Sequence, residues 1–98
     1  MKIITICGSL KFIEEMKVQA ELLELAGNCV LSVIYPTKSI SDYKPTEITA
    51  FSSAHFKKID LSDTIFVVNK DGYIGESTRK EINYAESEGK EIMYLEKK

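Results

Sequence analysis

The residues of this sequence that could do chemistry are concentrated in one stretch, where a loop with two glycines runs into the start of a helix. The stretch extends from Asn69 to Glu81 and includes Gly75, Ser77 and Thr78. The first turn of a helix presents unpaired backbone N–H groups and a positive dipole end, and hydroxyl groups add further donors. The pattern therefore predicts a site for a phosphate or carboxylate group. It matches neither the P-loop pattern nor the GxGxxG dinucleotide pattern.

Glu81 lies about one turn into this helix, three residues after Thr78, and two interpretations of it are open. In the first, the two residues form a capping box, in which the carboxylate accepts a hydrogen bond from the backbone N–H of Thr78. In the second, a carboxylate beside an anion site acts as a nucleophile or a base toward the bound ligand. The spacing alone favours the capping box.

His55 is the only histidine of the chain, and it shares an apolar helical stripe with Ile48, Phe51 and Ile59. A single histidine on such a stripe is more often a core residue than a ligand. Tyr73 is expected at the same cleft as the glycine-containing loop. Its ring could stack on a base there, although packing is the default interpretation for a tyrosine.

The elements that must position these residues alternate along the chain. Short apolar runs rich in β-branched residues predict four strands, at residues 3–7, 29–35, 64–68 and 91–95. Apolar residues spaced three or four apart predict three helices, at residues 10–26, 46–61 and 78–88. This order is typical of an α/β fold, in which a parallel sheet is covered by helices on both sides.

We expect a single domain over residues 1–98, built as a small flavodoxin-like or Rossmann-like three-layer sandwich. Its four-stranded parallel sheet should have the strand order 2-1-3-4. Ligands of such sheets bind beyond the carboxyl ends of the strands, here between the first and third. Gly8, Ser9 and residues 69–77 belong to that edge, whereas Asp60 and Asp63 belong to the opposite, amino edge.

Composition excludes several classes of protein. The 98 residues are 44% hydrophobic and 29% charged, which is typical of a globular domain and not of a disordered chain. The formal net charge is -2, and no basic block is longer than two lysines. A nucleic-acid polymer or a membrane surface is therefore not expected as a partner. No apolar run approaches the roughly 18 residues that would cross a bilayer.

The two cysteines, Cys7 and Cys29, are expected to be free thiols. They fall at opposite ends of neighbouring parallel strands, beyond the roughly 7 Å between Cα atoms that a disulfide allows. Neither has a CxxC or Cys/His neighbour in the sequence, so we expect no metal site. This cysteine usage favours a reducing, cytoplasmic setting.

Three motifs, taken in order and spacing, resemble the nucleoside 2-deoxyribosyltransferase superfamily. They are CGS at residues 7–9, HFKKIDLSD at residues 55–63 and GYIGESTRKE at residues 72–81. The similarity spans nearly the whole chain and is closest to the small branch that includes the 2'-deoxynucleoside 5'-phosphate N-hydrolases. In that family, a glutamate in the first turn of the helix after the third strand attacks C1' of the deoxyribose.

The resemblance implies a role for each matching residue. Glu81 matches the nucleophile, and His55 stands where the family has an aspartate that assists the reaction. The resemblance also implies a homodimer or larger assembly and no metal or redox cofactor. The residues that it and the loop pattern together place against a small nucleoside or nucleotide are Gly8, Ser9, Asn69, Tyr73, Gly75, Ser77 and Thr78.

Two function classes follow from these observations. The first is an N-glycosidase or 2-deoxyribosyltransferase that cleaves the N-glycosidic bond of a deoxynucleoside or its 5'-monophosphate. The second is a non-catalytic nucleotide-binding or sensing domain that retains the phosphate loop. The second is favoured by His55 in place of the family's aspartate and by a chain shorter than typical members. The base, the phosphorylation state and the choice between hydrolysis and transfer are left open.

Overall fold

The computed structural model describes residues 1–97 and contains one sheet of four parallel strands. The strands are β1 (Ile3–Gly8), β2 (Cys29–Leu31), β3 (Thr64–Val68) and β4 (Glu91–Tyr94). Their order across the sheet is β2-β1-β3-β4. This confirms the predicted α/β class and the predicted strand order. β1 and β3 occupy the centre and pair along the whole length of β3.

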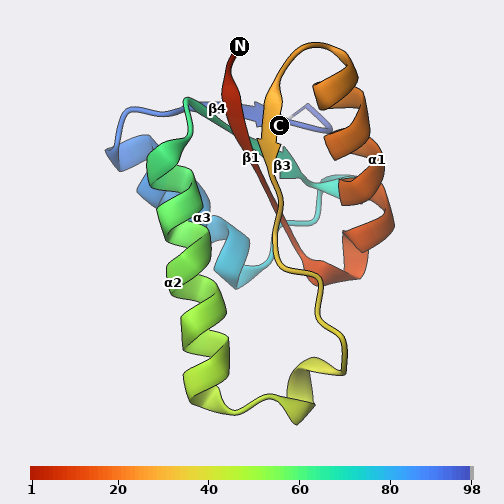
Figure 1. The fold of residues 1–98 in the computed structure, drawn as a ribbon, viewed down its shortest axis with the longest axis vertical. Helices are drawn as coiled ribbons and strands as arrows, with labels where there is room; N and C mark the ends of the chain where they lie inside the picture. Colours follow the sequence, from red (N-terminus) through yellow and green to blue (C-terminus); the bar gives the residue numbers. More distant parts are fainter. Residues whose placement is uncertain (98) are drawn as a thin grey trace.

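Helices cover both faces of the sheet, which makes three layers (Figure 1). Helix α1 (Ile13–Leu25) packs on one face, against side chains such as Ile6 and Phe66. Helices α2 (Pro45–Leu61) and α3 (Glu76–Ser87) pack on the other face, against side chains such as Ile65 and Val67. Alternate residues of β1 and β3 point to opposite faces, so both central strands are apolar along nearly their full length.

Strand β2 is shorter than the seven residues that its apolar run predicted. It pairs with β1 only at Cys29, Val30 and Leu31. Beyond Leu31 the chain leaves the sheet, and Val33 and Ile34 line a pocket instead of extending the strand. An apolar run therefore marked burial correctly here, but part of that burial is against a cavity wall and not within the sheet.

Helix α2 extends past the carboxyl edge of the sheet. It has 17 residues, or about 25 Å at 1.5 Å per residue, whereas the five residues of β3 span about 17 Å. In Figure 1 the first turns of α2 and the segment before it lie beyond the end of β1. This segment includes a 3₁₀ turn at Ile40–Asp42. The overhang forms one side of the pocket described below.

The amino edge of the sheet carries the two aspartates that the sequence placed there. Asp63 accepts a hydrogen bond of 2.8 Å from the backbone N–H of Ile3, and Asp60 accepts one from the hydroxyl of Tyr84. Cys29 also lies at this edge, opposite Ile3, while Cys7 lies opposite Val67. Both cysteines are free thiols, as predicted.

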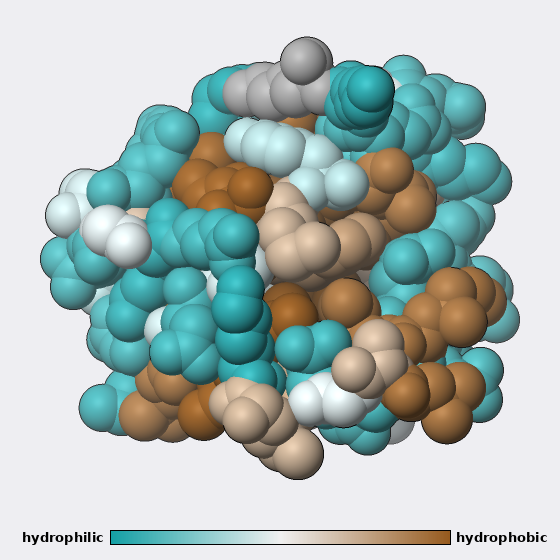
Figure 2. All heavy atoms as spheres, turned by 90° about the horizontal axis from the view of Figure 1, so that it is seen from above, coloured by the Kyte–Doolittle hydropathy of each residue, from teal (hydrophilic) through white to brown (hydrophobic). Residues whose placement is uncertain are grey.

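Several apolar side chains of α1 remain exposed on the surface away from the sheet. Val18, Leu22 and Leu25 follow one another at helical spacing, and each is at least half exposed. Figure 2 shows apolar residues reaching the surface on the right-hand side, where α1 lies. Among the helices described, none is both long enough and apolar enough to cross a membrane.

Candidate active site

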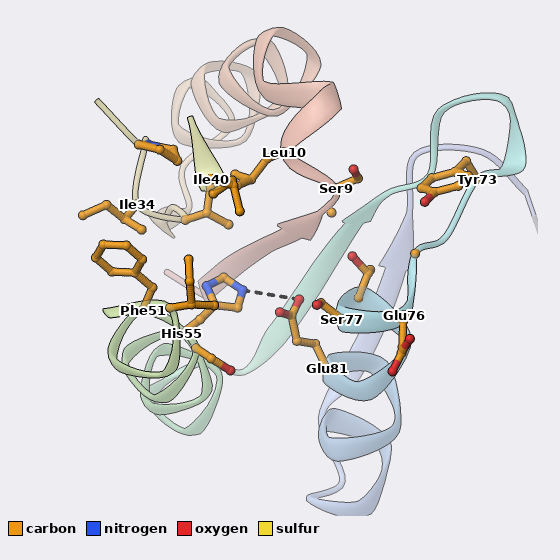
Figure 3. Close-up of a pocket in the computed structure, with 17 residues that line it drawn as sticks. Ser9, Leu10, Ile34, Ile40, Phe51, His55, Tyr73, Glu76, Ser77 and Glu81 are labelled. Carbon is orange, nitrogen blue, oxygen red and sulfur yellow. Dashed lines mark ion pairs between the residues drawn. The ribbon is translucent and has the colours of Figure 1, made fainter. Parts of the chain in front are cut away.

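A pocket of about 400 Å³ lies at the carboxyl ends of β1 and β3, between the overhang of α2 and the first turn of α3 (Figure 3). This is the edge at which parallel sheets bind ligands. Of the nine residues that the sequence proposed for the site, eight line the pocket: Gly8, Ser9, His55, Tyr73, Gly75, Ser77, Thr78 and Glu81.

Asn69 is the exception. Its buried side chain donates a hydrogen bond of 3.1 Å to the backbone carbonyl of Glu96 and accepts one of 2.9 Å from the backbone N–H of the same residue. Both polar ends of the amide are therefore paired within the fold. Asn69 joins the segment after β4 to the loop after β3 and does not line the pocket.

The first turn of α3 faces the pocket without a capping side chain. The helix begins at Glu76, two residues earlier than predicted, and its N-cap residue is Gly75, which has no side chain to accept a hydrogen bond. The backbone N–H groups of the first turn are consequently free to donate to a ligand. A Cβ atom on Gly75 would lie 3.3 Å from the hydroxyl of Tyr73, which is tight for any larger residue.

Glu81 is not part of a capping box. Thr78 is the third residue of α3 and not its N-cap, so the capping interpretation is wrong. The carboxylate instead points across the pocket floor toward α2 (Figure 3). Its Oε1 atom lies 3.7 Å from Nε2 of His55, and the two side chains are only 15% and 8% exposed.

Cys7 completes a buried cluster with these two residues. Its Sγ atom lies 3.4 Å from Nε2 of His55, and the donor atoms of all three side chains are within 4.8 Å of one another. The three residues come from β1, α2 and α3 respectively, so the packed core fixes their positions. His55 and Glu81 were predicted in one site from the sequence, but Cys7, which is far from both in the chain, was missed.

Burial moves the pKa values of the two titratable groups that face the pocket in opposite directions. It raises the pKa of Glu81 to about 7, and a hydrogen bond from the Cys7 thiol lowers it in part. Burial also lowers the pKa of His55 to about 4, with a smaller contribution from the positive charge of Lys58. Both effects arise because a charged group loses hydration when it leaves water.

A metal ion is a poor match for this cluster, although thiolate, imidazole and carboxylate are all zinc ligands. A ligating histidine usually donates its second ring N–H to an acceptor. Nδ1 of His55 is buried and has no hydrogen-bond partner within the described chain. Binding a metal through Nε2 would place a proton on that unpartnered nitrogen, so the residues present do not support a metal site.

The apolar wall of the pocket was only partly foreseen. Phe51 and Ile48 were assigned to a core stripe of the second helix, but both line the pocket, because α2 overhangs the sheet there. Ile34 and Ile40 add apolar surface from the segment before α2. The sequence signal for this wall was that apolar residues, such as Ile34 and Ile48, stand on both sides of the polar segment 36–47.

Tyr73 stands at the edge of the pocket and is held by two contacts. Its ring packs edge-on against Phe12 at 5.9 Å between centroids, and Nζ of Lys11 lies 3.4 Å from its centroid. The ring therefore presents a rigid surface beside Ser9 and the first turn of α3 (Figure 3). Of the two acidic residues on either side of Tyr73, Asp71 does not line the pocket, whereas Glu76 does.

Comparison of the chain with models of known protein families and with curated proteins finds no match.

Proposed function

We propose that the protein binds a deoxynucleoside or its 5'-monophosphate in this pocket and cleaves the N-glycosidic bond, with Glu81 as nucleophile. One observation carries the proposal: the carboxylate of Glu81 is buried in the pocket floor and serves no capping function. A carboxylate that is buried is costly for stability because it loses hydration, and such groups are frequent at functional sites.

The reaction needs only groups that the pocket provides, together with water. An oxygen of Glu81 forms a bond to C1', the bond from C1' to the base nitrogen breaks, and its electron pair stays on the base, which takes a proton from solvent. Water then adds to C1', the ester bond breaks, and its electrons return to the Glu81 carboxylate as the water loses a proton. A sugar hydroxyl in place of water would give transfer instead of hydrolysis.

The two sides of the pocket suit the two ends of a nucleotide. The N–H groups of the first turn of α3 and the hydroxyls of Ser77 and Thr78 suit a phosphate. The opposite wall, which includes Ile34, Ile40 and Phe51, suits the flat apolar faces of a base. Glu81 lies between them, where the sugar would be.

His55 acts in this proposal as a neutral hydrogen-bond donor. Because burial lowers its pKa to about 4, the ring is uncharged near neutral pH and is a weak general acid. Its Nε2 lies 3.4 Å from Sγ of Cys7 and 3.7 Å from Oε1 of Glu81, so an N–H at that atom helps to fix the buried cluster that holds the carboxylate. This role differs from that of the aspartate that the resembling family has at this position.

The test is a chromatographic assay for free base from a panel of deoxynucleosides and their monophosphates. Base release by the wild-type protein, with loss of at least a hundredfold in folded Glu81→Gln, is the expected result. No base from any member of the panel, with folded protein, would contradict the enzyme proposal. Calorimetry on the same panel then separates a nucleotide-binding domain, which binds without turnover, from a protein that does neither.

We also propose a homodimer in a cytoplasmic setting. The exposed stripe of Val18, Leu22 and Leu25 on α1 supports the dimer, because apolar side chains at helical spacing are usually covered. The absence of a disulfide between the described cysteines is compatible with a reducing compartment.

A further inference from the structure

Cys7 is a buried thiol that the proposed reaction does not use directly. It ends the buried part of β1 and has no exposed surface. Gly8, the next residue, approaches the backbone of β3 closely: a Cβ atom there would lie 3.2 Å from the carbonyl oxygen of Val68. The position of Cys7 is therefore set by the sheet, and its side chain forms the buried cluster together with His55 and Glu81.

The hydrogen-bond partners of His55 decide where the thiol proton goes. Nδ1 of His55 is buried and unpartnered within the described residues. A buried N–H without an acceptor is costlier than an unpaired lone pair, so the ring proton belongs on Nε2. Nε2 then has no lone pair to accept the thiol proton of Cys7. The remaining acceptor in the cluster is the carboxylate of Glu81.

We propose that Cys7 is a positioning residue for Glu81: its sulfur accepts the Nε2–H of His55, 3.4 Å away, and its thiol proton is donated to the Glu81 carboxylate, which favours the ionised form and turns it toward the pocket. The thiol donor is neutral, so it stabilises the negative charge without forming an ion pair that would reduce its nucleophilicity. The consequence for turnover rests on the proposed function, whereas the hydrogen bond itself does not.

The protonation state of the thiol supports this assignment. Burial, followed by the nearby charge of Glu81, raises the pKa of Cys7 well above its usual value, so the thiol keeps its proton and remains a donor. The same hydrogen bond lowers the pKa of Glu81. The other titratable group beside Glu81 is His55 from α2, which is neutral near pH 7. Glu76 lies at the pocket rim, and the charge of Lys58 acts on His55.

The experiment measures the proton affinity of Glu81 without depending on turnover. The side-chain carboxyl carbon of Glu81 is followed by NMR as a function of pH, with the signal assigned by its loss in Glu81→Gln. Two variants remove the donor, Cys7→Ala and the bulkier Cys7→Val, so that one remains if the other fails to fold. Cys7→Ser restores a donor, and Cys29→Ala is the matched control, because Cys29 lies at the opposite edge of the sheet.

We expect Glu81 to bind its proton at least about threefold more tightly in Cys7→Ala and Cys7→Val than in the wild type. Cys7→Ser should return it to the wild-type value or below, and Cys29→Ala should leave it unchanged. Unaltered proton affinity in both donor-free variants would overturn the proposal, even if base release is observed. If the affinity shifts as expected while no variant releases base, the positioning role stands and the enzymatic function fails.

Discussion

His55 and Glu81 lie 3.7 Å apart, and burial disfavours the charged form of both side chains. Burial lowers the pKa of the imidazole to about 4 and raises that of the carboxyl to about 7. Between these values both groups are neutral, below them only the histidine is charged, and above them only the glutamate. The contact therefore joins a neutral donor to a carboxyl group whose ionisation is close to balance near neutral pH.

The stability of the protein should reveal the Glu81 ionisation. The pKa of Glu81 in the folded protein, about 7, lies above the ordinary value of 4.5. The contribution of Glu81 to the free energy of unfolding is therefore fully present below pH 4.5 and is lost as pH rises through 7. The maximum loss is about 3 kcal/mol. We expect Glu81→Gln to be more stable than the wild type at pH 8, as measured by urea unfolding from pH 4 to 8. Glu86→Gln, an exposed change on the same helix, is the control.

His55 contributes in the opposite sense. Its folded pKa of about 4 lies below the ordinary 6.5, so its contribution is present above pH 6.5 and is lost as pH falls through 4. The two slopes oppose each other between pH 4.5 and 6.5, where the wild type should be nearly flat. Glu81→Gln should therefore show stability that rises with pH over this interval, and the same flat profile in that variant would contradict the assignment.

Turnover should follow the ionised fraction of Glu81. If the carboxylate is the nucleophile, the rate should rise about tenfold per pH unit below 7 and level off above it. Initial rates of base release from pH 5 to 8.5 measure this limb. A rate that is constant across the range would exclude Glu81 as the ionising group.

The Ser77 hydroxyl should distinguish a phosphorylated ligand from a nucleoside. Ser77 lies in the uncapped first turn of α3 and lines the pocket. Ser77→Ala should weaken binding of the monophosphate about ten- to a hundredfold, the usual effect of one hydrogen bond to a charged group, and leave nucleoside binding nearly unchanged. Calorimetry with both ligands tests this, with the exposed Ser53→Ala as control. An equal loss of affinity for the monophosphate and the nucleoside would contradict the placement of the phosphate at α3.

The two thiols should differ in reactivity. Cys29 is partly exposed, whereas Cys7 is fully buried and its pKa is raised by burial. A colorimetric thiol reagent should therefore titrate one cysteine in the native protein and both after denaturation without reductant. Rapid modification of both in the native state would mean that the cluster is open to solvent.

Light scattering tests the dimer. The chain has a mass of 11.1 kDa, and a particle of about twice that mass is expected at micromolar concentration. Leu22→Glu, which places a charge in the exposed stripe of α1, should shift the protein toward the monomer. A wild-type monomer at this concentration would remove the dimer from the proposal.

The sequence predicted the order of elements well because buried parallel strands and amphipathic helices leave clear apolar patterns. Strand β3 matches its predicted bounds at Thr64–Val68. The apolar pattern predicted wrongly at Val33 and Ile34. Both were assigned to a strand, but both line the pocket. Periodicity reports burial, and it does not tell a sheet from a pocket wall.

The site was predicted in part, for a similar reason. Topology placed the segment from Gly75 to Thr78 at the carboxyl edge correctly, since that edge follows from strand order. The capping box failed because a two-residue shift in the start of α3 moved Thr78 into the helix, and boundaries are the least reliable part of a prediction from pattern. The approach of Cys7 to Glu81 is a long-range contact that local spacing does not contain.

The overhang of α2 divides the pocket into two parts with different tolerance for change. Gly8, Ser77 and Glu81 are anchored by the packed sheet and by α3, whereas the wall formed by Ile34 and Ile40 comes from a segment outside the sheet register. Substitutions in that wall alter the shape offered to a ligand at little cost to the core. Under the proposed function, substitutions in this wall can therefore change which base is preferred, while the residues that cleave the N-glycosidic bond stay the same.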